Sequence, residues 1–422
     1  MKKIFVLGAS ALQVPAIKNA KEKGLYVYAL DYDPEAVGIA YADEFLCIST
    51  IDKEAVLEAA KKYEPDYIMT STSDMPVRCA AWVNEQLGKK ADIAYEDAIC
   101  ATDKVHMRRR MKEKNVPVPE FHVVDSFEDF KEAASLIGTR FVSKPADNAA
   151  SRGVVLVDLS SKQEVLEGIG ADFSDNMSDE AFYKAIYEYS KGYSRGGEVL
   201  VEEFMEGPEV SVESITVEGE SHIITITDKM VTEVPFFVET GHTEPSRLPL
   251  DVQEDIRNVA LKAIAALGVK NGPTHTEIKV TKSGAKLVEI AARLGGDFIT
   301  SRLVPLSTGV DMIDCQLSST LGETVNWQST KSCGSAIRFI FADDKEDTKE
   351  QVIKSIDGIE EAKKMPGVAE VVMTKKAGDL AGNLTNSGDR YGHVIATGKD
   401  AEEAARNAEA AVKKIVIVKT DK

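Results

Sequence analysis

The sequence predicts a mixed α/β and α+β protein with an N-terminal open parallel α/β sheet, a small mobile lid, an antiparallel sheet and a C-terminal α+β module. Residues 1–100 alternate continuously apolar runs with helical patterns, as buried parallel strands and their connecting helices do. Residues 201–320 contain apolar runs separated by turn residues, which is typical of antiparallel strands. The length of 422 residues is sufficient for two or three domains.

The first predicted domain, residues 1–100, is an open and parallel α/β unit. Strands are expected at KIFVLGA, LYVYALD, DEFLCIS and DYIMTS, with one helix after the first strand and another at KEAVLEAAKKY. Only Gly8 follows the first strand, where a dinucleotide-binding domain has GxGxxG. A dinucleotide-binding fingerprint is therefore absent.

The second predicted domain covers residues 101–325, with the lid at about 121–200. A basic helix, TDKVHMRRRMKEKN, opens this domain and is capped by Thr102 or Asp103. The lid holds strands at RFVSKP and GVVLVD, followed by a Gly- and Ser-rich stretch, part of which is expected to be mobile. Strands and one strong helix, DVQEDIRNVALKAIAALG, fill residues 201–325, and residues 326–422 form the C-terminal α+β domain.

The composition favours a cytoplasmic protein. A net charge of −18 argues against non-specific binding to nucleic acid or to anionic membranes. Five cysteines without a CxxC pair suit free thiols in a reducing compartment. The N-terminal apolar run breaks at Gln13, so it is read as a strand and a helix, and no run is long enough to span a bilayer.

The stretch HTEIKVTKSGAKLVEIAARLGG, residues 275–296, predicts a hairpin with two facing carboxylates. A three-residue loop, Lys282-Ser283-Gly284, places Ile278 opposite Val288 and Glu277 opposite Glu289. Like charges about 5 Å apart at Cβ destabilise a sheet. A shared proton or a divalent cation would relieve the repulsion, and Mg²⁺ typically uses one or two carboxylates together with substrate phosphates. The alternative is a solvated face softened by nearby lysines.

Two cationic side chains are candidates for binding anions. Arg293 lies four residues beyond Glu289, and its planar guanidinium can hold a carboxylate or an anionic intermediate; a surface salt bridge is the alternative. Lys144 precedes a loop of small residues, 147–153, whose backbone N–H groups could surround phosphate oxygens. The order differs from that of a P-loop, so an ordinary hairpin remains an alternative.

An acidic strand end offers contacts for a nucleoside. Glu202 and Glu203 interrupt the apolar run VLVEEFM, Gly207 and Pro208 turn the chain, and Glu209 begins the next strand. Backbone groups at such a strand end can bind a purine edge, and a carboxylate can accept hydrogen bonds from a ribose. A charged turn between two strands is the alternative.

The order of these signals resembles the ATP-grasp superfamily across most of the chain. EIAARLGGDFI and GHVIATGKDAEEA are similar to the branch that contains the L-amino acid ligases. GASALQVPAIKNAKEKG followed by ALDYDPEAVG resembles the domain that precedes the ATP-grasp domain in these enzymes. Carbamoyl phosphate synthetase, biotin carboxylase and the glycinamide ribonucleotide synthetase group are more distant relatives. The resemblance implies the three-part ATP-grasp architecture with a C-terminal module.

The resemblance also implies ATP and Mg²⁺ as cofactors, with Mn²⁺ as a substitute, and assigns site residues. The implied ATP-binding residues are Lys104, Lys144, Ser151, Gly153, Glu202, Glu203, Phe204, Met205 and Glu209. Glu277 and Glu289 would bind the metal, and Lys144 and Arg293 would be catalytic. The implied substrate-binding residues are Glu239, His242, Arg293, Gly296 and Asp297.

Two departures from the family pattern concern the metal and the phosphate loop. The family often has Asn two residues after its second metal carboxylate, where this chain has Ala291, so one metal ligand is missing or replaced by water. Ala149 and Ala150 stand where the phosphate loop usually has glycines, which could stiffen it.

The expected function is that of an ATP-dependent carboxylate–amine ligase. It would join an amino acid to another amino acid or amine through an acyl phosphate, releasing ADP and phosphate. Three alternatives remain open: a carboxylase-like enzyme that activates bicarbonate as carboxyphosphate, a phosphoribosylamine–glycine ligase-like enzyme, and a regulatory nucleotide-binding protein with a degraded site. The expected partners are a small-molecule carboxylate and an amine, with no nucleic acid and no membrane. A homodimer is expected only by analogy.

Overall fold

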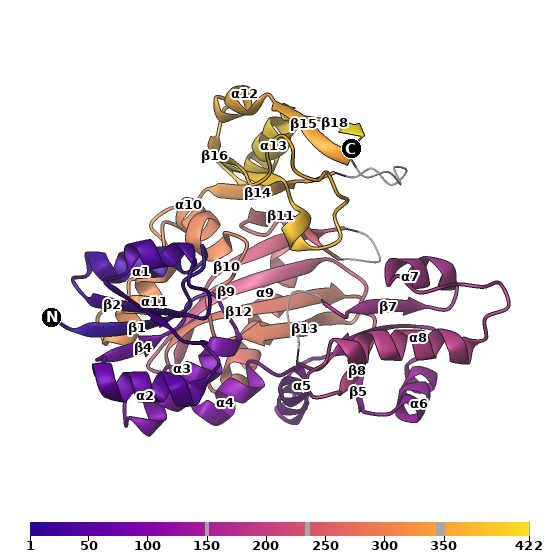
Figure 1. Ribbon diagram of the computed structural model, residues 1–422, viewed down its shortest axis with the longest axis horizontal. Coiled ribbons are helices and arrows are strands. Elements are labelled where there is room, and N and C mark those ends of the chain that lie inside the picture. The colour runs from indigo at the N-terminus through magenta and orange to yellow at the C-terminus, as the bar shows by residue number, and fades with distance from the viewer. Residues whose placement is uncertain (148–151, 233–236, 343–350, 422) are drawn as a thin grey trace.

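The computed structural model describes residues 1–147, 152–232, 237–342 and 351–421, and Figure 1 shows their arrangement. The described strands are β1 Lys3–Leu7, β2 Tyr26–Asp31, β3 Glu44–Cys47, β4 Tyr67–Met69, β5 Phe121–Val124, β6 Arg140–Pro145, β7 Val155–Asp158, β8 Val199–Glu203, β9 Glu209–Val217, β10 Glu220–Val231, β11 Glu239–Glu244, β12 Gly272–Thr281, β13 Gly284–Ala291, β14 Gly334–Ile340, β15 Gln351–Asp357, β16 Val368–Met373, β17 Gly392–Gly398 and β18 Val416–Asp421. The described α-helices are α1 Val14–Glu22, α2 Lys53–Tyr63, α3 Met75–Gln86, α4 Tyr95–Cys100, α5 Lys104–Glu113, α6 Phe127–Ile137, α7 Lys162–Gly168, α8 Asp179–Gly192, α9 Leu250–Leu267, α10 Val304–Thr308, α11 Met312–Leu321, α12 Ile359–Lys363 and α13 Ala401–Val412.

The N-terminal strands form the expected parallel sheet, in the order β3-β2-β1-β4. Alternate residues of β1 supply two cores. Phe5 and Leu7 pack with helices α2 and α3, whereas Ile4 and Val6 pack with α1 and with Leu317 of α11. Because α11 follows the central strands in the sequence, it ties this sheet to the rest of the molecule (Figure 1).

The lid region is a small antiparallel sheet, β5-β8-β6-β7, with helices α6, α7 and α8 packed against it. Its core contains Phe130, Phe141, Phe182 and Ile186. The Gly- and Ser-rich stretch expected to be partly mobile contains the fourteen-residue helix α8, capped by Ser178. The spacing of Phe182 and Ile186 places both on one helical face, and this apolar pair outweighs the polar composition around it.

An eight-stranded sheet forms the centre, in the order β13-β12-β9-β10-β11-β14-β17-β16. It continues across residues 325 and 326, because β14, β17 and β16 extend the sheet begun by β9 to β13 (Figure 1). One face buries apolar side chains such as Val212, Ile278 and Leu287 against α9. Since side chains alternate along a strand, Glu209, Glu277 and their neighbours point to the opposite face.

The β12–β13 hairpin pairs Glu277 with Glu289, as the sequence predicts, but its loop length and register differ from the prediction. The loop has two residues, Lys282 and Ser283, because Thr281 pairs with Gly284. The predicted pairing of Ile278 with Val288 is therefore wrong, and Ile278 pairs with Leu287. A β-bulge between Glu277 and Ile278 shifts the register by one residue and brings the carboxylates opposite each other.

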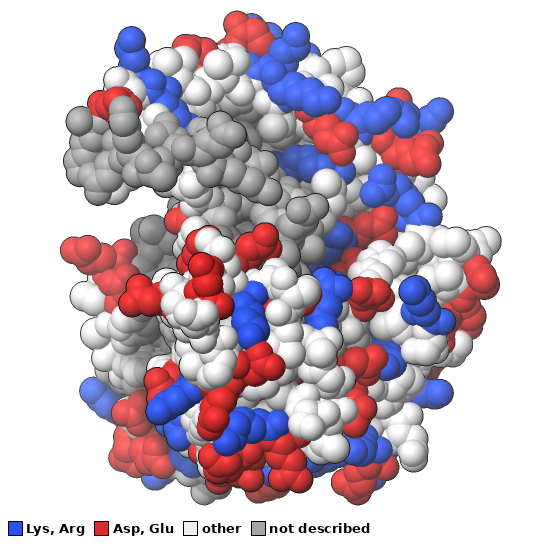
Figure 2. Space-filling view, turned by 90° about the vertical axis from the view of Figure 1, so that its right-hand side faces the viewer, with Lys and Arg blue, Asp and Glu red and all other residues white. Residues whose placement is uncertain are grey.

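The surface mixes charges of both signs. Figure 2 shows Lys and Arg side chains interspersed with Asp and Glu over one face, with no extended patch of a single sign. Within the described ranges, no helix is long and apolar enough to cross a membrane.

The turn between β8 and β9 requires glycine at position 207. Gly207 has φ +135°, and a Cβ there would lie 1.9 Å from the carbonyl oxygen of Val280 in β12. Gly219 also has a positive φ, +86°, but a Cβ would meet nothing within 4 Å. A comparison of substitutions at the two positions therefore distinguishes the effect of backbone strain alone from that of strain together with a steric clash.

We expect Gly207→Ala to destabilise the protein more than Gly219→Ala. The control carries only the left-handed penalty of about 1–2 kcal/mol, whereas Gly207→Ala must also displace β12. Thermal unfolding of both variants tests this, and equal melting temperatures would contradict the close contact.

Candidate active site

The face of the central sheet turned away from α9 carries a row of alternating acidic and basic side chains. Other parts of the chain contribute cationic side chains to this row: Lys104 from α5, Lys144 from the lid, Arg293 from the segment after β13 and Arg390 from the C-terminal region. Most of the predicted site residues belong to this row, in which each carboxylate is paired with a cation.

Lys144 is held by a buried carboxylate. Its Nζ lies 2.5 Å from Glu202 Oε2, and Nε of the fully buried Arg108 donates to Glu202 Oε1 at 2.6 Å. Burial opposes ionisation of Glu202, but the charges of Arg108 and Lys144 prevail and lower its pKa to about 2. Burial lowers the pKa of Lys144. The Glu202 side chain, which the family resemblance assigned to adenine, thus orients Lys144 in this structure.

The other predicted nucleotide residues lie around the end of β8. Glu203 accepts hydrogen bonds from Lys286 Nζ at 2.8 and 2.9 Å, the guanidinium of Arg140 lies 4.4 Å from the ring centroid of Phe204, and Met205 is buried.

The two described flanks of the predicted phosphate loop are each held by neighbouring residues. Ser151 lies outside the described residues, while Gly153 has φ +79° and packs so closely that a Cβ would lie 2.7 Å from Cβ of Tyr193. At the other end, the carboxylate of Asp147 accepts hydrogen bonds from the backbone N–H groups of Arg195 and Gly196.

The two predicted metal carboxylates each have a lysine partner. Lys104 Nζ donates to Glu289 at 2.9 Å, and Lys229 Nζ donates to Glu277 at 2.9 Å. Burial opposes ionisation of Glu277, yet Lys229 and His275 hold its pKa well below the usual range. Burial acts to lower the pKa of Lys104, but the ion pair with Glu289 outweighs this effect. The pKa of Lys104 is therefore raised. Glu277 is therefore held in its ionised form, and a lysine ammonium lies within hydrogen-bond distance of each carboxylate.

These two carboxylates fit Mg²⁺ only as part of a metal–nucleotide complex. Among the described residues, no group of three or more His, Cys, Asp or Glu side chains could hold a metal ion by itself. Two carboxylates are the usual protein contribution to a Mg²⁺ site completed by substrate phosphates and water. Their oxygen donors and partial exposure suit that chemistry.

Lys229 of β10 is a central residue that the sequence analysis did not single out. Its Nζ lies 2.6 Å from Glu209, 2.9 Å from Glu277 and 3.7 Å from Glu239, and its side chain is 5% exposed. It thus connects the carboxylates implied for ribose, metal and substrate. The stretch HIITITDKM mixes polar and apolar residues, so its lysine does not stand out in the sequence.

His275 is a second residue that the sequence analysis passed over. It pairs with Ala291 across the hairpin and lies on the same face as Glu277. Its Nδ1 lies 2.5 Å from Glu213 Oε1, and its Nε2 lies 3.6 Å from Glu277. Burial opposes protonation, but Glu213 prevails and raises the pKa of His275 to about 9. Gly295 is required beside this pair, since a Cβ there would lie 2.8 Å from both Glu213 Oε1 and His275 Nδ1.

The predicted substrate residues form two neighbouring groups. Arg293 Nε donates to Asp74 at 2.6 Å, so a carboxylate of the N-terminal domain orients the predicted catalytic arginine. Asp297 contacts Arg390 at 2.9 Å and His242 Nε2 at 3.4 Å, and Glu239 contacts Arg390 at 3.2 Å. Asp74 and Arg390 were not anticipated. Gly296 precedes Asp297 in the same turn, and its carbonyl accepts a hydrogen bond from the N–H of Ile299.

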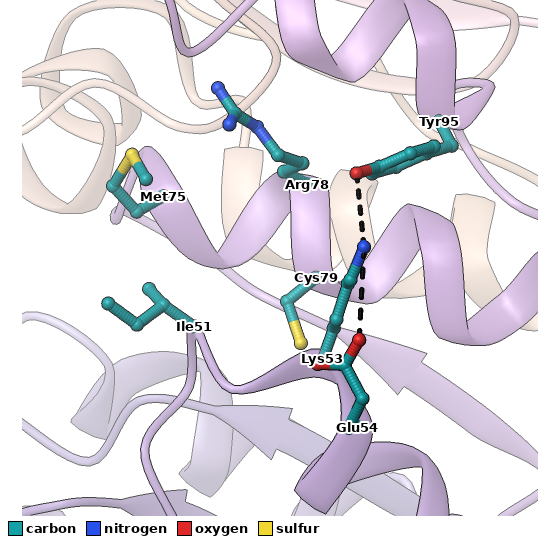
Figure 3. Close-up of a pocket in the computed structure, with 7 residues that line it drawn as sticks. All are labelled: Ile51, Lys53, Glu54, Met75, Arg78, Cys79 and Tyr95. Carbon is teal, nitrogen blue, oxygen red and sulfur yellow. Dashed lines mark hydrogen bonds and ion pairs between the residues drawn. The ribbon is translucent and has the colours of Figure 1, made fainter. Parts of the chain in front are cut away.

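A separate cavity of about 250 Å³ lies in the N-terminal domain and contains none of the predicted site residues. Its lining consists of Ile51, Lys53, Glu54, Met75, Arg78, Cys79 and Tyr95. Figure 3 shows Lys53 between the Tyr95 hydroxyl and the Glu54 carboxylate. Because the charged row lies outside this cavity, the candidate active site is assigned from its chemistry.

Comparison with known families identifies two parts of the chain. Residues 137–301 match the ATP-grasp domain. Residues 350–419 match the L-amino acid ligase C-terminal domain 2. The segment 137–301 is thus an ATP-grasp domain. The predicted family and fold class are thereby confirmed.

Similar proteins point to the same superfamily. Alanine–anticapsin ligase of Bacillus subtilis is 29% identical over 302 residues, which are 68% of this chain and 61% of that protein. The L-amino acid ligase of Bacillus licheniformis has a similar structure, with a TM-score of 0.79 and 19% identity over 99% of this chain and 98% of the other. The phosphoribosylglycinamide synthetase of Anaerococcus prevotii gives a TM-score of 0.74 at 20% identity, covering 99% of both chains. The chain spans about three fifths of the length of the curated relatives it matches.

Glu244, at the end of β11, is a fully buried carboxyl group beneath the site. Hydroxyl groups of Thr227 and Ser307 lie 2.9 Å from its two oxygens. Burial raises the pKa of Glu244 to about 8, from an ordinary value of 4.5. Between these values the folded protein keeps a proton that the unfolded chain has released, so stability falls as the pH rises through this interval.

We expect Glu244→Gln to reduce this pH dependence, because the amide stays neutral. The melting temperature of the variant should rise relative to that of the wild type as the pH increases from about 5 to about 8. Over this interval the wild type loses about 1.4 kcal/mol of its free energy of unfolding per pH unit, and the variant does not. Glu220→Gln on the exposed end of β10 is the control. Parallel profiles for wild type and Glu244→Gln would contradict a protonated Glu244.

We expect Glu277→Gln and Glu289→Gln to weaken metal binding to the nucleotide complex. Each amide keeps the size of the side chain but removes a charged oxygen ligand, so Mn²⁺ affinity in the presence of ADP should fall about tenfold or more. Electron paramagnetic resonance of free Mn²⁺ measures this without turnover. Unchanged Mn²⁺ affinity in both variants would rule out the carboxylate pair as the metal site.

Proposed function

We propose that the protein is an ATP-dependent carboxylate–amine ligase that joins an amino acid to another amino acid or amine through an acyl phosphate. The observation that carries this proposal is the facing pair of Glu277 and Glu289, with Lys104, Lys144 and Arg293 around it. The names of the ligases to which the chain is similar support it.

ATP would bind between the lid and the central sheet. Lys104 and Lys144 would contact phosphate oxygens, and Glu209 would hold the ribose. The buried Glu202–Arg108 pair keeps the Lys144 side chain in place before ATP arrives. Arg108 Nη2 also donates to the carbonyl of Val288 at 2.7 Å, which joins the lid strand to the metal hairpin. This preorganisation matters because phosphoryl transfer depends mainly on positioning and electrostatics.

Glu277 and Glu289 would hold Mg²⁺, which offsets negative charge on the phosphates when it is bound. Lys229 compensates Glu209 and Glu277 in the structure described here, so it would neutralise the site while Mg²⁺ is absent. Mn²⁺ would substitute for Mg²⁺.

The reaction would proceed in two steps. An oxygen of the substrate carboxylate, held by Arg293, attacks the γ-phosphorus of ATP, and the bond to the ADP oxygen breaks to leave an acyl phosphate. The amine nitrogen then attacks the carbonyl carbon, the bond to phosphate breaks, and the nitrogen releases one proton as the amide forms. Lys144 and Arg293 would offset the charge that develops. The closed lid would exclude water, which would otherwise hydrolyse the acyl phosphate.

Incubation with Mg-ATP and a pool of metabolites that contains the L-amino acids tests the proposal, with ADP release and product mass as readouts. Amide products that require both a carboxylate and an amine would support it. ADP release that depends on bicarbonate would indicate the carboxylase-like alternative. A product that joins phosphoribosylamine to glycine would indicate the phosphoribosylamine–glycine ligase-like alternative. The absence of turnover would indicate a regulatory nucleotide-binding protein. Homodimer formation remains a prediction.

We expect Lys144→Ala and Glu289→Ala each to reduce turnover by about a hundredfold or more, because each removes a charge that contacts the transferring group. Lys61→Ala, on an exposed position of α2, is the control. Rates like those of the wild type in either site variant would refute the assigned site.

A further inference from the structure

Arg390 links the C-terminal region to two carboxylates of the candidate site. Its Nη1 and Nη2 donate to the two oxygens of Asp297 at 2.9 and 3.0 Å, in the forked geometry that suits a carboxylate. Nη2 also donates to the side chain and the backbone carbonyl of Glu239, at 3.2 and 2.9 Å. One guanidinium therefore fixes side chains from β11 and from the segment after β13.

Arg390 lies behind these carboxylates. The carbon of its guanidinium lies 3.7 Å from the ring centroid of Phe339, and its Nε is buried without a hydrogen-bond partner among the described residues. The Arg390 side chain is 9% exposed, whereas those of Asp297 and Glu239 are 30% and 26% exposed. A small molecule in the site can thus reach the two carboxylates, while the guanidinium already uses both of its terminal nitrogens.

The charges around the two carboxylates favour a positively charged ligand. Lys229 lies 3.7 Å from Glu239 but closer to Glu209 and Glu277, so its charge is shared among three carboxylates. Arg390 is likewise shared between Glu239 and Asp297. Glu209 and Glu277 have further cationic neighbours in Lys279 and His275, at 3.5 and 3.6 Å. Glu239 and Asp297 share the single guanidinium of Arg390, with Lys229 3.7 Å from Glu239 and the imidazole of His242 3.4 Å from Asp297. The accessible excess of negative charge therefore lies on Glu239 and Asp297.

We propose that Arg390 is a positioning residue that fixes Glu239 and Asp297 as a subsite for the protonated amino group of the amine substrate. The proposal rests on the ligase function proposed above and adds the charge state in which the amine is recognised. Charge-assisted hydrogen bonds from an ammonium group to two held carboxylates would select amines over alcohols of the same shape. The bound ammonium then transfers one proton to a carboxylate of the subsite, and its nitrogen attacks the carbonyl carbon of the acyl phosphate as the bond to phosphate breaks.

Arg390→Met and Arg390→Lys in the full chain test this proposal. A pool of L-amino acid amides serves as the amine, because these amides carry an ammonium group and no carboxylate to be activated. Hydroxylamine replaces them in a parallel assay, in which it traps the acyl phosphate as a hydroxamate. We expect Arg390→Met to raise the amide concentration for half-maximal product formation by about tenfold or more, and to raise the ratio of hydroxamate to amide product. Arg390→Lys should recover part of this loss, since it keeps the charge without the fork.

Arg302→Gln is the matched control. Arg302 pairs with Glu370 of β16, so it joins the same two parts of the chain outside the site. If Arg390 only docks the C-terminal region, Arg302→Gln and Arg390→Met would lower the melting temperature and both activities alike. That result, or an unchanged amine dependence in Arg390→Met, would overturn the proposal.

A binding assay separates this proposal from the ligase function. If the wild type forms no hydroxamate with any amino acid, the ligase proposal fails, and melting temperatures measured with Mg-ADP and the amide pool decide on Arg390. Stabilisation of the wild type that is lost in Arg390→Met and in Asp297→Asn would support the ammonium subsite. No stabilisation of the wild type, or equal stabilisation of all three proteins, would overturn it.

Discussion

The close approach of Glu277 and Glu289 across one hairpin is the constraint around which this site is built. Two carboxylates on facing strand positions repel each other, and their neighbours are arranged to offset that repulsion. Lys104 approaches one from α5, and Lys229 approaches the other from β10. The apolar face of the same strands packs against α9, so the hairpin cannot rotate to expose its charges to solvent.

Much of the fold could be predicted because its signals are local. The continuous apolar runs of the first domain and the turn residues between later strands correspond to elements observed in the structure. The hairpin shows where local reasoning stops. A two-residue loop together with a bulge produces the same pairing of Glu277 with Glu289 as the predicted three-residue loop. A bulge cannot be recognised from the hydrophobic pattern of the sequence. Helix α8 was missed because glycines and serines around it dominate the composition.

The candidate site was predicted unevenly for a similar reason. Residues in recognisable motifs, such as Lys144 and Arg293, lie in the charged row, although their roles remain predictions. Their partners come from distant parts of the chain: Asp74 is 219 residues from Arg293, and Arg390 is 93 residues from Asp297. Such pairs depend on which strands are neighbours in the sheet, and a single sequence does not specify that order. Lys229 and His275 were similarly inconspicuous, since each lies among other polar residues of its strand.

The shared central sheet also limits how the gene can be shortened. Strand β11, which carries Glu239 and His242, hydrogen-bonds to β14 along its outer side. A truncated chain ending at residue 325 would leave that side as an open edge, with unpaired backbone groups available to other chains. It would also lose the arginine that holds Asp297. The last hundred or so residues therefore cannot be removed without consequence: a fragment ending at residue 325 would be prone to self-association, and its Glu239 and Asp297 side chains would lack a shared partner.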